Sequence, residues 1–346
     1  MEIKPISLKE QIQGAIIFFL EKAKMKCLHT QEGLLQIVNS LSAYKEEGKA
    51  FFPEVYVLDD FDVLKNTFKA SFLYYIIGEE KKSKTAFENA LKKCAPLTEN
   101  NWSIYILRSK SKIEYGLFSC RSSILSSSAS EMLIPKEASN EKVILIHQIA
   151  DKIVEIKTNK VPSVIINFGI GNTIESSPIE QHTQFIDTII KNCPGDIKEN
   201  AKTFYSKLFL EVSQKGHGNL SVVVNHSKLL PKILNIDGVI LRPEINIGNT
   251  IINWKKEKSS ESITNLNNMF SLVLGMLNSD GVTVFNDRGD ILAYRVFIQH
   301  PQTKTKKPII GGARSRTFDV LKRNVGKQLE SCFMLSQDGK IQIKLK

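Results

Sequence analysis

Apolar residues recur at two different spacings along the chain, and the spacing predicts which segments are helices and which are strands. Near the start, apolar positions three or four residues apart predict amphipathic helices from Ser7 to Cys27 and from Thr30 to Tyr44. Shorter runs rich in β-branched and aromatic residues predict strands. In the first half of the chain these strands are expected at residues 54–58, 102–107, 112–118, 143–146, 153–156 and 164–168.

Two more helices are expected among these strands. The acidic residues of segment 59–62 suit the start of a helix, because negative charge is favourable at a helix N-terminus. The apolar positions that follow predict that this helix continues to about residue 75; they are Val63, Leu64, Phe68, Phe72 and Tyr75. A helical pattern at 83–94 ends just before Pro96.

The second half of the chain alternates in the same way. Helical spacing is found at residues 179–192, 196–212, 227–234, 261–277 and 317–325. Strand patterns are found at 220–224, 238–241, 282–284, 291–298, 330–335 and 340–345, with a turn at 287–290 that makes a hairpin. Alternating helices and strands predict an α/β protein, with a mixed β-sheet flanked by helices in its C-terminal part.

A Pro-Gly step at residues 194 and 195 is the strongest break between two separately patterned regions. It follows the helical pattern of 179–192 and precedes the next helix. The sequence therefore predicts two domains: an N-terminal α/β domain of unknown role at 1–195, and a second domain at 196–346. A length of 346 residues also favours two domains over one.

Positive charge is concentrated at the C-terminal end. The formal net charge is +11, and from His300 to the end eleven Lys and Arg face three Asp and Glu. This surplus favours an anionic ligand, either a nucleotide or a nucleic acid. The other interpretation is that lysines simply cover the surface.

The five cysteines are scattered without any C-x-x-C pair, so they predict neither a zinc site nor a disulfide framework. They are typical of reduced thiols. The first residues lack the layout of a signal peptide, and the longest apolar run, Ala15 to Leu20, is too short to cross a membrane. We therefore expect a cytoplasmic protein without a membrane partner.

Two short motifs near the C-terminus carry candidate chemistry. Asp280-Gly281 lies between the helical pattern of 261–277 and a strand, so the carboxylate is expected at a helix-to-strand corner. The segment Gly311-Gly312-Ala313-Arg314-Ser315-Arg316 precedes the helix expected at 317–325. Glycines before a helix leave backbone N–H groups exposed, and arginines two apart add forked donors that suit phosphate oxygens. The segment predicts an anion site.

The order and spacing of these motifs resemble the diadenylate cyclase domain of the DNA-integrity-scanning proteins. That family carries Asp-Gly-Ala and Gly-Thr-Arg-His-Arg, where this chain has Asp280-Gly281-Val282 and Gly312-Ala313-Arg314-Ser315-Arg316. The resemblance covers roughly Phe204 to Lys346, because the segment 216–225 falls where the family places its first core strand. It says nothing about residues before that.

The resemblance implies roles for these residues. In the family two domains face each other, each with one ATP, and the Asp helps a metal ion to activate the ribose 3′-hydroxyl that attacks the α-phosphate of the partner's ATP. Asp280 would be the catalytic and metal-binding residue, with Mg²⁺ or Mn²⁺ as cofactor in an active enzyme. Nucleotide binding would fall to Gly281, Val282, Gly311, Gly312, Ala313, Arg314, Ser315 and Arg316. The resemblance also implies a homo-oligomer formed through the C-terminal domain.

Three functions remain open. The first is a sensor of a nucleotide, either ATP or a cyclic or oligonucleotide, because Ala313 and Ser315 replace the threonine and histidine of the family while both arginines remain. The second is an active cyclase that makes cyclic di-AMP, because Asp280 is retained. The third is a basic nucleic-acid-binding protein, because of the charge at the C-terminal end.

Overall fold

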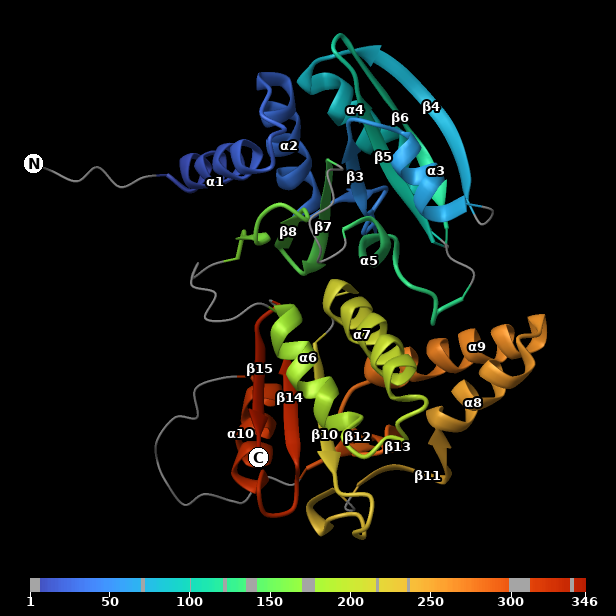
Figure 1. Cartoon of the computed structure of the whole chain (residues 1–346). Coiled ribbons are helices and arrows are strands. Elements are labelled where there is room, and N and C mark those ends of the chain that lie inside the picture. Colours follow the sequence, from blue (N-terminus) through green and yellow to red (C-terminus); the bar gives the residue numbers. More distant parts are fainter. Residues whose placement is uncertain are drawn as a thin grey trace, which may run out of the picture. The chain divides into compact units, whose positions relative to one another are not determined.

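The computed structural model describes residues 7–69, 72–99, 101–120, 123–134, 142–169, 178–215, 218–234, 237–298, 312–336 and 339–346. The chain forms two compact units (Figure 1). Unit 1 comprises residues 1–122 and 126–173, and unit 2 comprises 123–125 and 174–346. Each unit has its own mixed β-sheet flanked by helices, so the prediction of an α/β fold is confirmed.

Unit 1 contains a seven-stranded sheet and five α-helices among the residues described. The strands are β3 (Val55–Leu58), β4 (Leu73–Lys81), β5 (Trp102–Arg108), β6 (Lys112–Ser119), β7 (Val143–Ala150), β8 (Ile153–Lys157) and β9 (Val164–Asn167). The helices are α1 (Leu8–Lys22), α2 (Leu28–Leu41), α3 (Asp62–Phe68), α4 (Lys84–Cys94) and α5 (Ala129–Leu133). A short hairpin joins β1 (Lys45–Glu46) to β2 (Lys49–Ala50).

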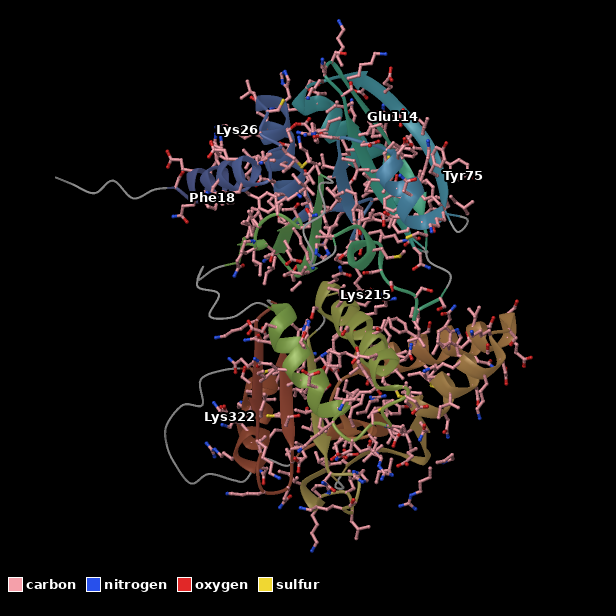
Figure 2. All side chains as sticks on the ribbon, in the orientation of Figure 1. Phe18, Lys26, Tyr75, Glu114, Lys215 and Lys322 are labelled. Atoms are coloured by element: carbon pink, nitrogen blue, oxygen red, sulfur yellow. The ribbon has the colours of Figure 1, made fainter. Side chains whose placement is uncertain are left out.

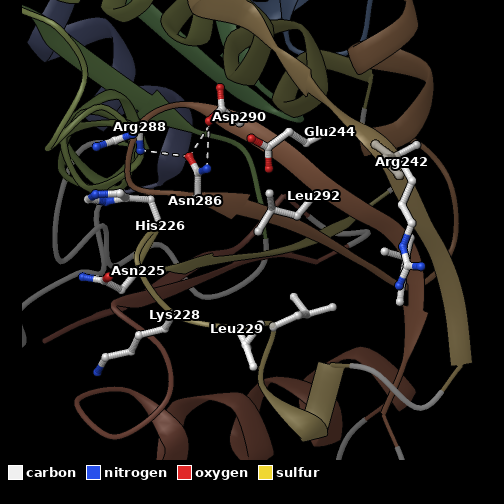
Figure 3. A pocket seen from close by; sticks show the side chains of 13 residues that line it. Asn225, His226, Lys228, Leu229, Arg242, Glu244, Asn286, Arg288, Asp290 and Leu292 are labelled. Atoms are coloured by element: carbon white, nitrogen blue, oxygen red, sulfur yellow. Dashed lines mark hydrogen bonds between the residues drawn. The ribbon is translucent and has the colours of Figure 1, made fainter.

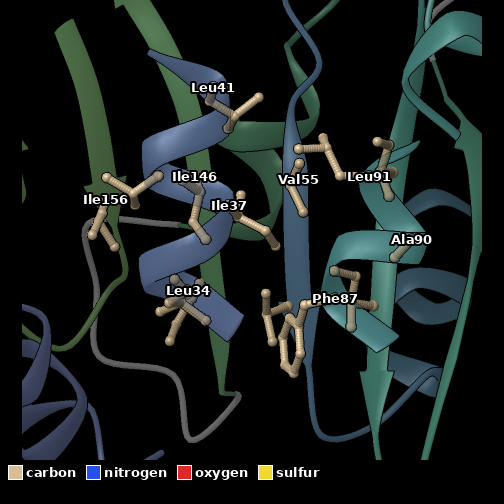
Figure 4. Close-up of a cluster of buried hydrophobic side chains, with 14 of the residues drawn as sticks. Leu34, Ile37, Leu41, Val55, Phe87, Ala90, Leu91, Ile146 and Ile156 are labelled. Atoms are coloured by element: carbon tan, nitrogen blue, oxygen red, sulfur yellow. The ribbon is translucent and has the colours of Figure 1, made fainter. Parts of the chain in front are cut away.

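The sheet of unit 1 has the strand order β4-β6-β5-β3-β7-β8-β9, and β3 and β5 are its parallel pair. Helices α2 and α4 pack on one face, where Leu34, Ile37 and Phe87 are fully buried (Figure 4). The other face packs against α3 and α5. Because both faces are covered, every residue of the central strands β3 and β7 is buried, and the apolar residues run consecutively instead of alternating, with His147 and Gln148 as the buried polar residues of β7.

Unit 2 contains a six-stranded sheet and five α-helices among the residues described. The strands are β10 (Asn219–Val224), β11 (Asp237–Asn246), β12 (Val282–Asn286), β13 (Asp290–Phe297), β14 (Ser331–Leu335) and β15 (Ile341–Leu345). The helices are α6 (Pro178–Ile189), α7 (Lys198–Lys215), α8 (Ile247–Glu257), α9 (Ser260–Leu277) and α10 (Ala313–Asn324).

The sheet of unit 2 has the order β11-β13-β12-β10-β14-β15, and β10 and β12 are parallel while all other neighbours are antiparallel. Helices α6, α7, α8 and α9 supply one apolar core on one face, together with Val223 of β10. Helix α10 covers the other face through Phe318 and Leu321, which pack with Val222 and Val224. Successive side chains of β10 thus point into the two cores in turn, so the strand is buried on both faces.

The predicted domain boundary at Pro194-Gly195 is wrong. Helix α6, which precedes it, packs into the core of unit 2 through Phe185 and Ile186. The same core continues beyond the Pro-Gly step with Ile197. The break is therefore a turn between two helices of one unit, since a Pro-Gly step marks a local turn and carries no information about which core the flanking helices enter.

Several predicted elements differ from the structure. The helix expected to reach residue 75 is α3, which ends at Phe68, and β4 follows it as a strand. The helix expected at 227–234 is reduced to a 3₁₀ turn at Lys232–Leu234, since Pro231 lacks a backbone N–H and disfavours helix in the residue before it. Helix α8 was not expected. Helix α10 begins at Ala313, four residues before its predicted start.

Candidate functional site

The two motifs meet at one end of the unit 2 sheet. Arg314 lies in the first turn of α10, and Asp280 directly precedes the Gly281 step into β12. The Arg314 Nη2 atom lies 3.4 Å from Asp280 Oδ1, so the two residues form an ion pair across 34 positions of sequence. The Asp280 side chain is 78% exposed and that of Arg314 is 31% exposed. The pair is therefore open to solvent and to a ligand.

Gly218, just before β10, lies beside Arg314 at the same end of the sheet. Its φ of +77° lies in the left-handed region that disfavours side chains. A Cβ atom at this position would lie 2.7 Å from Arg314 Nη1, so the guanidinium rests directly over the glycine backbone. The absence of a side chain at Gly218 thus allows the guanidinium to lie close to the backbone. Gly216 and His217, which precede it, lie outside the described residues.

The glycine of the Asp280-Gly281 step has a packing role. Gly281 has φ +93°, and a Cβ atom here would lie 2.8 Å from the backbone carbonyl carbon of Arg295 in β13. Val282, which follows, is 1% exposed and packs in the core beneath α10. Gly281 and Val282 were both predicted to bind the nucleotide. Neither offers an exposed side chain, so a ligand could contact only their backbone atoms.

The first turn of α10 presents backbone N–H groups and charge together. Gly312 is the N-cap residue and has no side chain to accept from the first N–H groups of the helix. Ala313 and Arg316 are exposed and Ser315 is half-buried. Gly311 lies outside the described residues. The N-terminal end of a helix attracts anions through these N–H groups and through the helix dipole, so the turn and its two arginines suit a phosphate group.

A metal ion at this end would have few protein ligands. Among the described residues no group of three His, Cys, Asp or Glu side chains could hold a metal ion. Asp280 offers one carboxylate. Because Mg²⁺ is often bound through one or two carboxylates together with phosphate oxygens and waters, Asp280 fits a metal ion that arrives with a nucleotide, and not a resident metal site.

A cavity lies at the opposite end of β10 and β12, where both parallel strands finish (Figure 3). Its volume is about 290 Å³. The residues that line it are Asn225, His226, Lys228, Leu229, Leu230, Ile240, Leu241, Arg242, Glu244, Asn286, Arg288, Asp290 and Leu292. The charge around it is mixed, with three Lys and Arg side chains and two carboxylates. The cavity therefore favours a phosphate less than the first turn of α10 does.

The histidine of this cavity is held in place by a buried carboxylate. Asp287 is 1% exposed and accepts from His226 Nδ1 at 2.7 Å and from Asn192 Nδ2 at 2.8 Å. Burial would raise the pKa of the Asp287 carboxyl, but its hydrogen bonds with the His226 backbone, the His226 ring and Asn192 outweigh burial and lower it. Ser227 Oγ lies 3.0 Å from His226 Nε2, so both ring nitrogens are engaged.

The pKa of a neighbouring carboxyl, that of Asp290, is shifted in the opposite direction. Burial raises the pKa of Asp290, which accepts from Asn286 Nδ2 at 2.8 Å.

Sequence patterns did not identify this cavity, because segment 287–290 reads as an ordinary hairpin turn. The available signal was the presence of polar residues directly after two strands, Asn225 and His226 after β10 and Asp287 after β12. Parallel strands place such residues at the same edge of a sheet.

Comparison with protein-family models, with curated proteins and with solved structures finds no match to this chain. In the part of the chain that the structure describes, no helix is long and apolar enough to span a membrane. The geometry of unit 2 is therefore the main basis for a functional hypothesis.

Proposed function

We propose that unit 2 binds a nucleotide through its phosphates at the first turn of α10, and that the chain is a sensor of this nucleotide. The supporting observation is the convergence of Arg314, Asp280 and Gly218, which come from three separate segments. The Arg314 guanidinium is already ordered in the free protein, so less side-chain conformational entropy is lost when a ligand binds. The ligand class is ATP or a related cyclic nucleotide, as the resemblance to diadenylate cyclases implies.

Each residue has a distinct part in this proposal. Arg314 and Arg316 contact phosphate oxygens, and the uncapped N–H groups after Gly312 add further donors. Asp280 holds Arg314 in the free protein, and the incoming phosphate takes over part of that contact. If the nucleotide brings Mg²⁺ or Mn²⁺, the exposed carboxylate of Asp280 is available to it.

A sensor is favoured over an active cyclase by the side chains next to the arginines. Ala313 offers no hydroxyl group, and Ser315 offers no imidazole at the position where the family has histidine. The remaining arginines and backbone N–H groups provide electrostatic binding. The Ser315 hydroxyl can make one hydrogen bond in place of the imidazole, but Ala313 leaves the threonine hydroxyl unreplaced, which supports ligand binding without turnover.

The test is to incubate the full chain with ATP, GTP or cyclic di-AMP in the presence of Mg²⁺ or Mn²⁺. Calorimetry measures affinity and mass spectrometry detects bound nucleotide and cyclic products. We expect binding of at least one of these nucleotides and no cyclic product. Absence of binding to all three would show that the proposal is wrong.

Arg314→Ala tests the site itself. A charge-assisted hydrogen bond contributes roughly 1.5–3 kcal/mol, so we expect the nucleotide affinity to fall about ten- to a hundredfold, and Arg316→Ala to act in the same direction. Arg323→Ala is the matched control, because this exposed arginine lies in the last turn of the same helix. Unchanged nucleotide affinity in both Arg314→Ala and Arg316→Ala would show that these arginines do not bind the phosphates.

Asp280→Asn separates the sensor from the cyclase. If cyclic di-AMP forms with the wild-type chain, the chain is a cyclase and this variant should lose product by orders of magnitude, while the affinity for ATP holds or rises slightly. If the chain is a sensor, both proteins bind and neither makes product.

A single-stranded oligonucleotide tests the nucleic-acid alternative. Tighter binding of the oligonucleotide than of any mononucleotide, with affinity that falls steeply as salt rises, would indicate contacts to several phosphates. That outcome would favour a basic nucleic-acid-binding protein.

A further inference from the structure

The outer edge of the unit 1 sheet exposes a continuous apolar strand. β4 pairs with β6 on one side, and in the described part of the chain no strand pairs with its other side. Five consecutive side chains at its start are large, apolar or aromatic and well exposed: Leu73 (59%), Tyr74 (43%), Tyr75 (61%), Ile76 (58%) and Ile77 (38%). Figures 1 and 2 show β4 and Tyr75 at this edge. We call residues 73–77 the β4 edge segment.

Charged side chains, which normally protect an edge strand, lie only in the second half of β4, and a β-bulge lies in the middle of the strand, between Ile76 and Gly78. Glu79 pairs with Lys112 at 2.6 Å, and Glu80 accepts from Tyr115 at 2.6 Å. The β4 edge segment has no charged residue and no proline. Natural proteins protect exposed edges with charges, prolines, bulges or covering elements, because free backbone N–H and C=O groups recruit further strands. Residues 73–76 precede the bulge and have none of these features, which indicates that another strand covers them.

We propose that the β4 edge segment pairs with the same segment of a second copy of this chain, antiparallel and around a two-fold axis at Tyr75. In this register Tyr75 lies opposite Tyr75, Tyr74 opposite Ile76, and Leu73 opposite Ile77. Aromatic pairs and aromatic–β-branched pairs are the combinations that stabilise neighbouring antiparallel strands. A two-fold pairing is self-complementary, so each exposed apolar side chain meets an exposed apolar side chain.

The charged half of β4 is compatible with this register. Glu79, Glu80 and Lys81 lie beyond the five paired positions, so no two like charges are placed opposite each other within the segment. The β-bulge between Ile76 and Gly78 interrupts the pairing with β6 at Ile77, the last residue of the β4 edge segment. A bulge increases the local twist of a strand, which ends regular pairing there. The paired region is thus limited to the apolar half.

The apolar area suits a weak, reversible interface. The exposed parts of the five side chains amount to about 500 Å² per copy, and the largest apolar patch of a typical monomer is of similar size. Edge-to-edge pairing buries only the part of each side chain that faces the partner strand, because successive side chains of a strand point to opposite faces of the sheet. Two copies therefore bury less than about 1,000 Å², the size of a weak or transient interface. We therefore expect a dimer that dissociates on dilution.

Sedimentation or light scattering of the full chain over a range of concentrations tests the dimer. We expect the wild-type chain to dimerise and Tyr75→Lys to raise the dissociation constant at least tenfold, because two ammonium groups would meet on the axis. Ile76→Lys should act in the same direction. Leu229→Lys is the matched control: this leucine is 94% exposed in unit 2, so the variant should dimerise like the wild type. Circular dichroism checks that each variant is folded.

A cross-link tests the register. Directly opposed residues of antiparallel strands are close enough for a disulfide, so Tyr75→Cys should give a covalent dimer on a non-reducing gel. The wild type shows the background from its own five cysteines, and Leu229→Cys should add nothing to it.

Three results would overturn the proposal. They are a chain that is monomeric at all concentrations, a dimer that Tyr75→Lys and Ile76→Lys leave unchanged, and a Tyr75→Cys variant without additional cross-link. The second result would place the interface elsewhere, for example in unit 2, where the resemblance to the cyclases implies one. A nucleotide-binding test on the same samples is independent of this outcome, because the β4 edge segment and Arg314 lie in different units.

Discussion

Gly218 and Gly312 are both near Arg314, but only one of these positions requires glycine. Gly218 has φ +77° and lies under the guanidinium, whereas Gly312 has φ −69° and open space where a Cβ would be. A glycine is needed where the backbone is left-handed or where another group approaches it closely.

Gly218→Ala should therefore weaken both folding and binding. We expect a loss of about 1–2 kcal/mol in unfolding free energy from the left-handed backbone, and roughly tenfold lower nucleotide affinity because the Cβ displaces Arg314. Gly312→Ala is the control and should change stability by less than about 1 kcal/mol. Denaturant titration and calorimetry measure the two effects. Equal behaviour of the two variants would argue against the position that we assign to Arg314.

Asp287 gives unit 2 a pH-dependent stability. Its pKa is lowered in the folded state, so its hydrogen bonds stabilise the fold above the unfolded pKa and are lost as the pH falls through the folded pKa. We expect stability to decline as the pH falls from about 5 to below 3. Asp287→Asn should lower stability at pH 7 and reduce this acid slope.

The control for this prediction is an exposed carboxylate. Asp187 is 52% exposed and pairs with Lys202 at 2.9 Å. Surface ion pairs contribute about 0–1 kcal/mol, so Asp187→Asn should leave the curve of stability against pH almost unchanged. If the two variants gave the same curve, the buried hydrogen bonds of Asp287 would not be the source of the acid slope.

At the scale of elements, α6 is the helix that the sequence pattern assigned to the N-terminal domain and the structure assigns to unit 2. Phe185 is fully buried and packs against Phe209 of α7 and Phe333 of β14. The ring centroids are 5.5 and 5.2 Å apart, respectively. Because this ring joins α6 to both a helix and the sheet, α6 is an integral part of unit 2.

Phe185→Ala measures that contribution. Removal of a buried phenylalanine side chain costs about 3–5 kcal/mol, through lost burial and the cavity that remains. We expect hydrogen exchange in β10 and β14 of unit 2 to accelerate, while β5 and β6 of unit 1 keep their protection. Leu229→Ala, at an exposed position, should change neither unit. Loss of protection confined to unit 1 would contradict the assignment of α6.

The segment after α3 shows why short apolar runs are ambiguous. Phe72 and Tyr75 continue the helical spacing of Phe68, yet a run of five apolar residues also suits a strand. Pairing of β4 with β6 decides in favour of the strand, since eight of its nine residues pair with β6, which satisfies the backbone groups that face this neighbour. Because the sequence pattern predicted a helix up to residue 75, it did not predict that β4 is an exposed edge strand.

At the scale of the whole molecule, the two units carry different candidate activities. Unit 2 holds the Arg314 site and the His226 cavity, and unit 1 holds the β4 edge segment. A sensor needs a part that binds the signal and a part that transmits it. A chain that binds a nucleotide with one unit and self-associates with the other would meet both needs.

The sequence by itself determined the α/β class, most of the helices and strands, and the candidate anion motif, because these depend on residue spacing within short segments. The pairing of Arg314 with Asp280 and Gly218 required the tertiary structure, since the sheet brings together positions that are far apart in the chain. The unit to which α6 belongs and the exposure of β4 also depended on packing and strand pairing between distant residues. Local patterns carry no information about such contacts.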